Sequence, residues 1–326
     1  DWVAAGLLQN PELTVGLGFP HVAPSATRLT ASFVQDFIGL ATLPSRKKIA
    51  AAERAAIQLR LAHEAINLVA ETKRAFYTLQ GDRLMLAKFQ TACDAGRAGA
   101  QLALLQHQAG NISDYELALR QDAYNAFRLQ TAQRQAALQQ QRETLNRLLG
   151  LGDAQTGWRT VAALPDLPAK EPPLDRLESL ALAQRYDFAA GKADYAAAAC
   201  ALGLAVDTRF FTNLGLGVQY ERDPDRQGTL GPAINVGVPL FNRGQAAVAR
   251  SRAQLRQISD QLEAGAADIR ADVRAARERL LAARDIALFY RDTLLPGQRR
   301  LLELAQQRYN GMLLGIYDLL LAKQHE

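Results

Sequence analysis

The chain has 326 residues and carries 38 Lys and Arg against 33 Asp and Glu, which gives a formal net charge of +5. Hydrophobic residues make up 48% of the sequence and aromatic residues only 7%, so a mainly disordered chain is excluded. Ala and Leu supply most of the apolar residues, which favours long, closely packed helices over one thick globular core. No run of about 18 apolar residues occurs, so the sequence predicts no transmembrane helix. The two cysteines form neither a metal-binding spacing nor a disulfide framework.

The N-terminal part of the chain has the period of β-strands. Apolar residues alternate with small or polar ones over 14–19 and, less regularly, over 29–40. This alternation predicts two strands, each with one apolar face. We assign residues 10–44 to this first strand pair.

A long helical hairpin is predicted next, over residues 45–150. Over 46–107 the chain lacks proline and repeats apolar residues at steps of three and four, so it predicts one helix of roughly 62 residues, or about 93 Å. A turn at 110–113 separates it from a second helix over 113–149. A single globular domain has little use for a rod of this length, whereas a coiled coil or the wall of a duct needs one.

The middle of the chain is rich in glycine and proline. Residues 150–173 contain two prolines in succession and several glycines, and cannot continue a helix. We therefore expect an irregular belt over 151–188, outside the long helices. A helix that returns to the strands should follow over 189–208.

The last part of the chain repeats the order of the first. Strands are predicted over 214–220 and 233–240, within a second strand pair that spans 209–241. A second long helical hairpin should occupy 242–326. Its first helix contains Pro296, which must kink it or end it one residue earlier.

An internal repeat explains this order. Matching segments lie 197 to 202 residues apart: 17–19 with 216–218, 43–46 with 240–243, and the turn at 110 with the turn at 312. By this symmetry we expect a further helix before residue 10 and a continuation of the second hairpin beyond residue 326. The chain, which opens with Asp-Trp-Val, should thus be a segment that is trimmed at both ends.

Four strands with one apolar face cannot close a barrel by themselves. About eight strands are the minimum, and an open sheet would leave two unpaired edges and an exposed apolar face. Two chains supply eight strands and three supply twelve, both even numbers that suit an outer-membrane barrel. The residues expected to face lipid are Leu216, Val218, Val236 and Val238. Rods of about 90 Å cannot lie in the bilayer and should project into an aqueous space.

Several short motifs resemble those of the TolC-type outer-membrane efflux protein family. They are Asn-Pro-Glu-Leu at 10–13, Pro-Leu-Phe-Asn-Arg-Gly at 239–244, the segment 180–188 that ends Arg-Tyr-Asp-Phe, and Ala-Gln-Gln-Arg-Tyr at 305–309 followed by Asp-Leu-Leu at 318–320. Together with the duplication, the resemblance covers nearly the whole chain. Ser45, Tyr186 and Met312 depart from it, since they stand where the family has glycine, proline and glycine.

The resemblance implies a mainly α-helical fold with a small β part, assembled as a homotrimeric α/β barrel tube. It implies a twelve-stranded barrel in the outer membrane, with most of each chain in the periplasm. Further implied partners are a periplasmic adaptor protein, an inner-membrane pump that acts indirectly, and outer-membrane lipid. The chain would then be the passive duct of a tripartite efflux or type I secretion system. The sequence does not distinguish among drugs, metal ions, solvents and polypeptides as the transported substrate.

The resemblance also implies two sites near the helical turns. The adaptor-docking tip comprises Gly110, Asn111, Ile112, Ser113, Met312, Leu313, Leu314 and Gly315. A periplasmic gate is implied at Asp318, and the repeat places Glu116 at the equivalent depth. Leu321 and Leu314 stand where the family has a second ring carboxylate and a tip arginine, so we expect a less tightly closed gate. The alternative for Asp318 is a role in capping the helix after the second turn.

Signals for chemistry are weak. The four histidines have no partner at metal-binding spacing, and no catalytic set can be assembled, so we expect no enzyme, metal site or cofactor. Acidic residues are interleaved with the arginines of 250–279, which favours a salt-bridged helix surface over nucleic-acid binding. The basic run at 46–48 fits either contact with lipid phosphates or a solvated first helical turn. The rival function is a soluble coiled-coil scaffold or a periplasmic adaptor with long hairpins.

Overall fold

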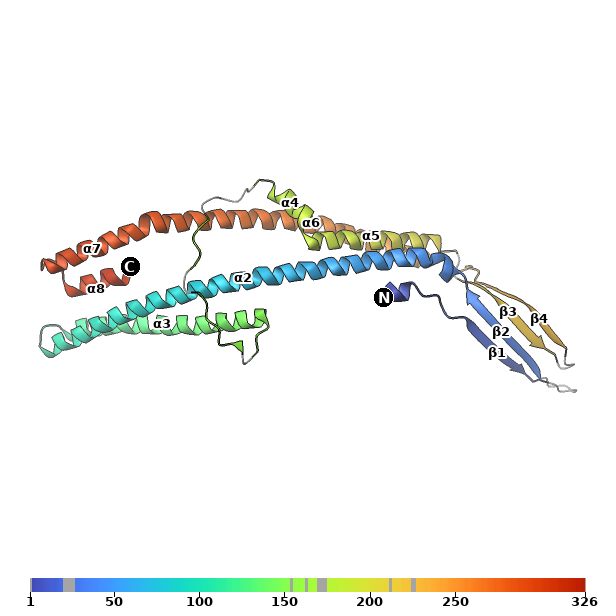
Figure 1. Ribbon diagram of the computed structural model, residues 1–326, viewed down its shortest axis with the longest axis horizontal. Helices are drawn as coiled ribbons and strands as arrows, with labels where there is room; N and C mark the ends of the chain where they lie inside the picture. The colour runs from blue at the N-terminus through green and yellow to red at the C-terminus, as the bar shows by residue number, and fades with distance from the viewer. Residues whose placement is uncertain are drawn as a thin grey trace. The chain divides into compact units, whose positions relative to one another are not determined.

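The computed structural model describes residues 2–19, 27–152, 155–161, 164–168, 175–210, 213–223 and 227–325 (Figure 1). The chain forms two compact units. The first comprises Asp1–Glu64 and Arg176–Val273, and the second comprises Ala65–Asp175 and Arg274–Glu326. Each unit therefore combines segments from both halves of the repeat.

The first unit contains one antiparallel sheet with the strand order β1-β2-β3-β4 (Figure 1). The strands are β1 (Glu12–Gly18), β2 (Arg28–Asp36), β3 (Leu214–Arg222) and β4 (Gly228–Val236). The register pairs Phe33 with Val218 and Val218 with Pro232, so each apolar face continues from strand to strand. The two halves of the repeat meet at the central pair, β2 and β3. Within the described sheet, the outer edges of β1 and β4 have no partner strand.

The ends of two strands differ from the sequence-based prediction. The strand expected over 29–40 ends at Asp36, because the Asp36 carboxylate accepts hydrogen bonds from the backbone N–H groups of Ile38 and Gly39 at 3.0 and 3.2 Å and starts a helix there. The strand expected over 233–240 ends at Val236. It begins at Gly228, five residues earlier than expected, because it pairs along the whole of β3.

The longest helix, α2 (Ile38–Gln108), has 71 residues and belongs to both units. It starts eight residues before the predicted position and includes Pro44, whose missing N–H deprives the preceding turn of one hydrogen bond. The Arg46 guanidinium donates to the carbonyl oxygen of Gly39 at 2.9 Å in this first part of the helix. After the turn, α3 (Asp114–Leu149) returns antiparallel to α2, as predicted (Figure 1).

The belt region contains one short helix, α4 (Leu177–Gln184), and α5 (Tyr186–Asp207) follows it directly. The helix that returns to the strands thus begins three residues before the predicted start at 189. Of the expected belt, 153–154, 162–163 and 169–174 lie outside the described residues. Near the N-terminus, α1 (Trp2–Ala5) is a single helical turn.

The second long hairpin consists of α6 (Gln245–Phe289), α7 (Leu295–Asn310) and α8 (Ile316–His325). Between α6 and α7, Tyr290–Leu294 forms a π-helical turn. Pro296 occupies the first turn of α7. The predicted break therefore takes the form of a π turn just before the proline, which absorbs the missing N–H without ending the helical rod.

Alanine dominates the small core. Among the described residues, eleven apolar side chains are buried, and five of them are alanines. They are Ala50, Ala56, Ala103, Ala190 and Ala197. Small side chains let helices approach closely along their length, as the composition predicted, instead of enclosing one thick core.

Candidate functional site

One face of the sheet is apolar on all four strands. Its members include Leu13, Val15, Leu17, Phe33, Leu216, Val218, Leu230, Ile234 and Val236, and each of them is exposed. Ile234, for example, retains 69% of its accessible surface. A contiguous apolar surface on a protein marks a site of contact with lipid or with another protein. The expected lipid-facing residues Leu216, Val218 and Val236 lie on this face.

Val238 is the exception among the expected lipid-facing residues. It lies beyond the end of β4, in the segment 237–244 that leads to α6, and is exposed. The strand prediction extended β4 by four residues too many, because Gly237 and Pro239 preserve an apolar alternation. Gly237 N still bonds Asn213 O at 3.3 Å, but Pro239 has no N–H with which to continue the ladder.

The opposite face of the sheet carries small and polar residues. Gly215 and Gly217 lie on it, and a Cβ atom at Gly217 would lie 2.0 Å from the carbonyl oxygen of Phe33. Any side chain there would push β2 and β3 apart. The Gly-Leu-Gly sequence at 215–217 therefore serves close strand pairing.

The first helical turn has two separate stabilising devices. Gly110 adopts φ +77°, and hydrogen bonds from Gly110 N to His107 O at 2.9 Å and from Asn111 N to Gln106 O at 2.8 Å close the end of α2. Ser113 then caps α3, since its hydroxyl accepts from Glu116 N at 3.3 Å, and Ser113 N donates to the Glu116 carboxylate at 2.9 Å. The hydrogen bonds that the Ser113 backbone N–H and hydroxyl donate to this carboxylate lower the pKa of Glu116. The Glu116 carboxylate, expected at a gate, is thus engaged in a capping box.

The second helical turn repeats this backbone with different side chains. Met312 adopts φ +57°, and Met312 N bonds Tyr309 O at 3.0 Å, as Leu313 N bonds Arg308 O at 2.8 Å. The matching residue is glycine in the first turn. Met312 is 95% exposed and Leu313 is 73% exposed. Within the described residues, the Asp318 carboxylate makes no hydrogen bond or ion pair; it lies 3.5 Å from the position of a Cβ on Gly315.

The two hairpins contact each other near these turns. The Tyr317 hydroxyl on α8 donates to the Gln106 side-chain oxygen on α2 at 2.6 Å. The Arg120 guanidinium on α3 lies 4.2 Å from the centre of the Tyr317 ring. The turns at 110–113 and 312–315 therefore belong to one structural region of the second unit. Sequence reasoning did not find this contact, because its partners are more than 190 residues apart.

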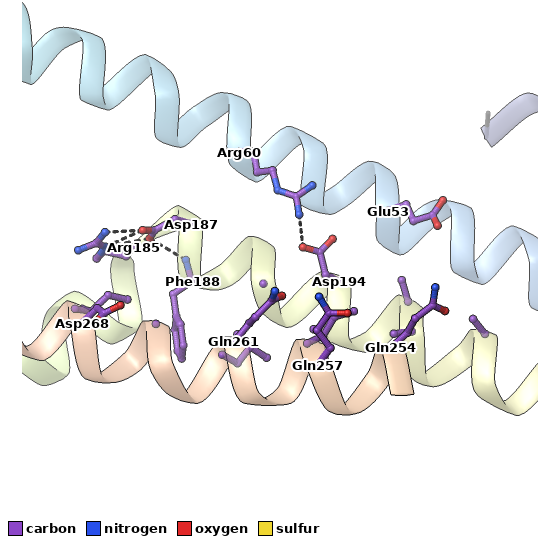
Figure 2. Close-up of a pocket in the computed structure, with 18 of the residues that line it drawn as sticks. Glu53, Arg60, Arg185, Asp187, Phe188, Asp194, Gln254, Gln257, Gln261 and Asp268 are labelled. Atoms are coloured by element: carbon purple, nitrogen blue, oxygen red, sulfur yellow. Dashed lines mark hydrogen bonds and ion pairs between the residues drawn. The ribbon is translucent and has the colours of Figure 1, made fainter. Parts of the chain in front are cut away.

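An open groove of about 750 Å³ lies among α2, α5 and α6 of the first unit (Figure 2). Three amide side chains on α6 line it at steps of three and four residues: Gln254, Gln257 and Gln261. Arg60 on α2 forms an ion pair with Asp194 on α5 across the groove (Figure 2). The lining mixes apolar and polar side chains and carries both signs of charge. Among the described residues, no cluster of three or more His, Cys, Asp or Glu could hold a metal ion.

The Arg-Tyr-Asp-Phe motif fixes the start of α5 at one end of this groove. The Arg185 guanidinium donates to both carboxylate oxygens of Asp187, at 3.0 and 3.2 Å from Nε, and Phe188 N donates to the same group at 2.8 Å. The hydrogen bond from Arg185, aided by that from Phe188 and opposed by burial, lowers the pKa of Asp187. Arg185 also lies 3.8 Å from Asp272 on α6. Tyr186, where the family has proline, occupies the first helical position, at which proline is favoured but not required.

The described part of the belt is pinned to the first hairpin. Trp158 Nε1 donates to the side-chain oxygen of Asn146 at 2.7 Å, and Asn146 is buried. The Arg142 guanidinium donates to the carbonyl oxygens of Thr156 and Trp158 at 2.6 and 2.8 Å and lies over the Trp158 ring. On α2, the buried Gln80 donates to Val161 O at 3.1 Å. These residues hold an irregular segment in place, and nothing in the local sequence pattern predicts their pairing.

Comparison with solved structures shows which proteins share this architecture. The chain is similar to the outer membrane protein VceC of Vibrio cholerae, with 18% identity, a TM-score of 0.71 and coverage of 99% of this chain and 82% of that one. It is similar to the CmeC outer membrane channel of Campylobacter jejuni, with 15% identity, a TM-score of 0.74 and coverage of 99% and 73%. The MtrE outer membrane channel of Neisseria gonorrhoeae shares 16% identity, with a TM-score of 0.63 and coverage of 99% and 76%.

These similarities establish the fold. The chain has the fold of TolC-type outer membrane channels, mainly helical with a four-stranded sheet, and the expected fold class is confirmed. No family model matches the sequence, and no curated protein sequence matches it significantly. Across the described residues, every helix is too short or too polar to span a membrane.

Proposed function

We propose that this chain is a protomer of an outer-membrane channel, a passive duct from the periplasm to the exterior that serves an efflux or secretion system. The observation that carries this proposal is the sheet, whose apolar face is exposed on all four strands and whose outer edges are unpaired. Neither feature suits a monomer in water, since each invites association. Both suit one section of a closed barrel in lipid.

The number of chains follows from barrel geometry. Three copies of a four-stranded sheet give twelve strands, and the strands of seven to nine residues approach the length that tilted strands need to cross a bilayer. We therefore propose a homotrimer, in which β1 of one chain pairs with β4 of the next. The small and polar face would then line the lumen.

A charge placed at the centre of the apolar face tests the barrel. Val218 is the middle residue of β3, so Val218→Arg should destabilise the membrane-inserted protein by about 2–4 kcal/mol, whereas Val236→Arg at the strand end should cost about 0–1 kcal/mol. Gln219→Arg is the matched control, because the adjacent side chain lies on the opposite face. The measurement is thermal stability of the full-length protein in lipid. Equal stability of the Val218 and Gln219 variants would contradict the barrel.

The same samples distinguish a channel protomer from the rival function, a soluble coiled-coil scaffold or a periplasmic adaptor. A coiled-coil scaffold or a periplasmic adaptor would stay folded and monodisperse without detergent, and neither arginine would matter more than the other. A channel protomer requires detergent or lipid, and single-channel conductance in a planar bilayer then measures the activity directly.

We further propose that the turn region is the periplasmic end of the duct. The exposed apolar side chains of Met312 and Leu313 offer a docking surface for an adaptor protein, next to the glycine of the first turn. An inner-membrane pump would supply the energy through that adaptor. A bulky residue at Gly110 should abolish export at unchanged protein levels, and unaltered cross-linking to the adaptor would remove the proposal.

Asp318 is the proposed gate residue. Its carboxylate makes no hydrogen bond or ion pair among the described residues, so three copies around a symmetry axis could form a ring that attracts cations. Asp318→Ala should weaken cation selectivity and block by trivalent cations in single-channel recordings. Asp318→Glu is the control, because it keeps the negative charge at the same position and should leave cation selectivity unchanged. Unchanged selectivity in the Asp318 variant would exclude it from the constriction.

A further inference from the structure

The end of the sheet that adjoins the helices forms a distinct surface, which we call the collar. It comprises residues 37–48, 208–210 and 237–244, where strands and helices join. The junctions are linked, since Phe37 N bonds Leu214 O at 2.9 Å. The β4–α6 junction packs on the α5–β3 junction, where a Cβ on Gly244 would lie 2.9 Å from the Cβ of Arg209. The collar is thus one continuous surface of the first unit.

The collar is basic. It contains Arg46, Lys47, Lys48, Arg209 and Arg243. Among the described residues, the acidic ones that adjoin it in the sequence or in the sheet are Glu12, Asp36 and Asp207. The Asp36 carboxylate is already engaged by the first backbone N–H groups of α2.

Its cations are available for binding. Lys47, Lys48 and Arg243 are exposed and form no ion pair within the described residues. The Arg209 guanidinium, also exposed, lies 4.2 Å from the centre of the Phe210 ring, which leaves its edge open to an anion.

Apolar side chains accompany these cations. Phe210, Leu240 and Phe241 are exposed in the same segments, and Phe241 retains 95% of its accessible surface. They lie in the same short segments between the sheet and the helices as Arg209 and Arg243. Aromatic side chains next to cations are the usual composition of a membrane–water interface, where rings lie at headgroup depth.

At the other end of the sheet, the described residues carry no such excess of positive charge, since Arg28 and Arg222 are matched by Glu221 and Asp223. There Arg28 forms an ion pair with Glu221 and lies 3.2 Å from Asp223, so its charge is neutralised within the protein. Solvation of a helix surface would not require such a difference between the two ends. Recognition of a negatively charged surface on one side of the barrel would require this difference.

We propose that the collar binds the phosphate headgroups of anionic phospholipids in the leaflet that adjoins the helices. The inference rests on the proposed function, because it requires the sheet to lie in a membrane. Lys47, Lys48 and Arg243 would contact the phosphates, Arg209 would do so from its ring-stacked position, and Phe241 would reach between the acyl chains. Basic residues near an anionic surface contribute about 1 kcal/mol each, which is about fivefold in affinity.

Native mass spectrometry of the full-length protein tests the collar. The protein, in a neutral detergent, is mixed with equal amounts of phosphatidylglycerol and phosphatidylcholine, and retained lipids are counted. The wild type should retain phosphatidylglycerol over phosphatidylcholine by tenfold or more, and high salt should reduce this preference. The variant Lys47→Gln/Lys48→Gln/Arg209→Gln/Arg243→Gln should bind both lipids equally.

Two controls separate charge from damage to the fold. Glutamine at four exposed arginines of α6, namely Arg252, Arg256, Arg270 and Arg279, changes the net charge equally and should leave the preference intact. Lys47→Arg/Lys48→Arg/Arg209→Lys/Arg243→Lys keeps the collar charge and should also keep it. No preference in the wild type, an equal loss in the α6 variant, or a preference that survives in the collar glutamine variant would each overturn the proposal.

Conductance distinguishes this failure from failure of the proposed function. A wild-type protein that conducts in a planar bilayer but shows no lipid preference would overturn the collar alone. A protein that neither conducts nor prefers an anionic lipid would contradict both the lipid-binding collar and the proposed channel function. In a parallel sample with an acidic peptide added at the same concentration, retention of the peptide in place of phosphatidylglycerol would make the collar a protein contact and would also overturn the proposal.

Discussion

The two helical turns share a backbone but differ in every side chain that stabilises it. Both close the preceding helix with the same pair of hydrogen bonds and one residue at positive φ. The first turn uses Gly110 there and adds a capping box from Ser113. The second turn places Met312 at positive φ and Gly315 at the cap position, where no side chain can accept a bond. The duplication has therefore preserved the geometry of the turn while its stabilisation has diverged.

This difference indicates that the second turn is the easier one to open. A non-glycine residue in the left-handed region costs about 1–2 kcal/mol, and a capping side chain contributes about 1 kcal/mol. The turn with less local stabilisation is also the one that exposes Met312 and Leu313 and precedes the proposed gate. Segments that move in function are drawn from the less stable parts of a fold.

The largest effect is expected at Gly110. Gly110→Ala should lower the local stability of the first turn by about 1–2 kcal/mol, because nothing lies within 4 Å of the new Cβ and the cost is that of the backbone conformation alone. Amide hydrogen exchange of the full-length protein measures it. Gly81→Ala is the matched control: its Cβ also meets open space, but the residue is helical, so stability should rise by about 0.5–1 kcal/mol. The same sign at both positions would contradict the comparison.

A smaller effect of opposite sign is expected at Met312. Met312→Gly should relieve the positive φ and stabilise the second turn by about 0.5–1 kcal/mol, since the greater freedom of glycine in the unfolded chain offsets part of the gain. Slower exchange of the amides at 311–313 would show it. Leu313→Gly, at the next position, has no positive φ to relieve and should speed exchange. Faster exchange in the Met312 variant would mean that the two turns are not strained differently.

The smallest effect concerns pH. Hydrogen bonds from Ser113 hold the pKa of Glu116 below its usual value of 4.5, so the folded state favours the carboxylate. The resulting stabilisation is complete above that usual value and is lost as the pH falls through the lower folded-state pKa. Exchange at the first turn, corrected for its intrinsic rate, should therefore accelerate in acid. Glu116→Gln removes the titrating carboxylate and should abolish this pH dependence, whereas Ser113→Ala keeps the backbone N–H donor and should only weaken it. An unchanged dependence in the Glu116 variant would refute the assignment.

The sequence predicted the features that depend on local pattern. Alternation located the four strands, the absence of proline located the long helices, and the duplication matched Gly110 with Met312, which share their backbone conformation. The errors of the prediction lay at the ends of strands and helices. The apolar residues up to Leu40 extended the predicted strand, but the Asp36 carboxylate starts a helix before Leu40, and a capping bond carries no periodic signal.

Contacts between distant segments could not be predicted. Tyr317 and Gln106 meet only because the two hairpins lie together, and neither residue is unusual in its own helix. The pairing of Trp158 with Asn146 similarly depends on the path of an irregular segment. The resemblance to a known family pointed to the Arg-Tyr-Asp-Phe motif, but only the structure shows that its ion pair fixes the start of a helix.

The π-helical turn at Tyr290–Leu294 lets the second hairpin carry one extra residue without changing the direction in which its tip faces. One residue corresponds to about 100° of rotation around an α-helix, and a π turn takes up one residue more than an α-helical turn. The helix that follows, α7, therefore keeps its facing relative to the end of α6, and so does the turn at Met312. Removal of one residue from 290–294 should convert the π turn into an α-helical turn and leave the facing of the tip unchanged. Removal of one residue from 274–289 should instead rotate the tip by more than a quarter of a circle.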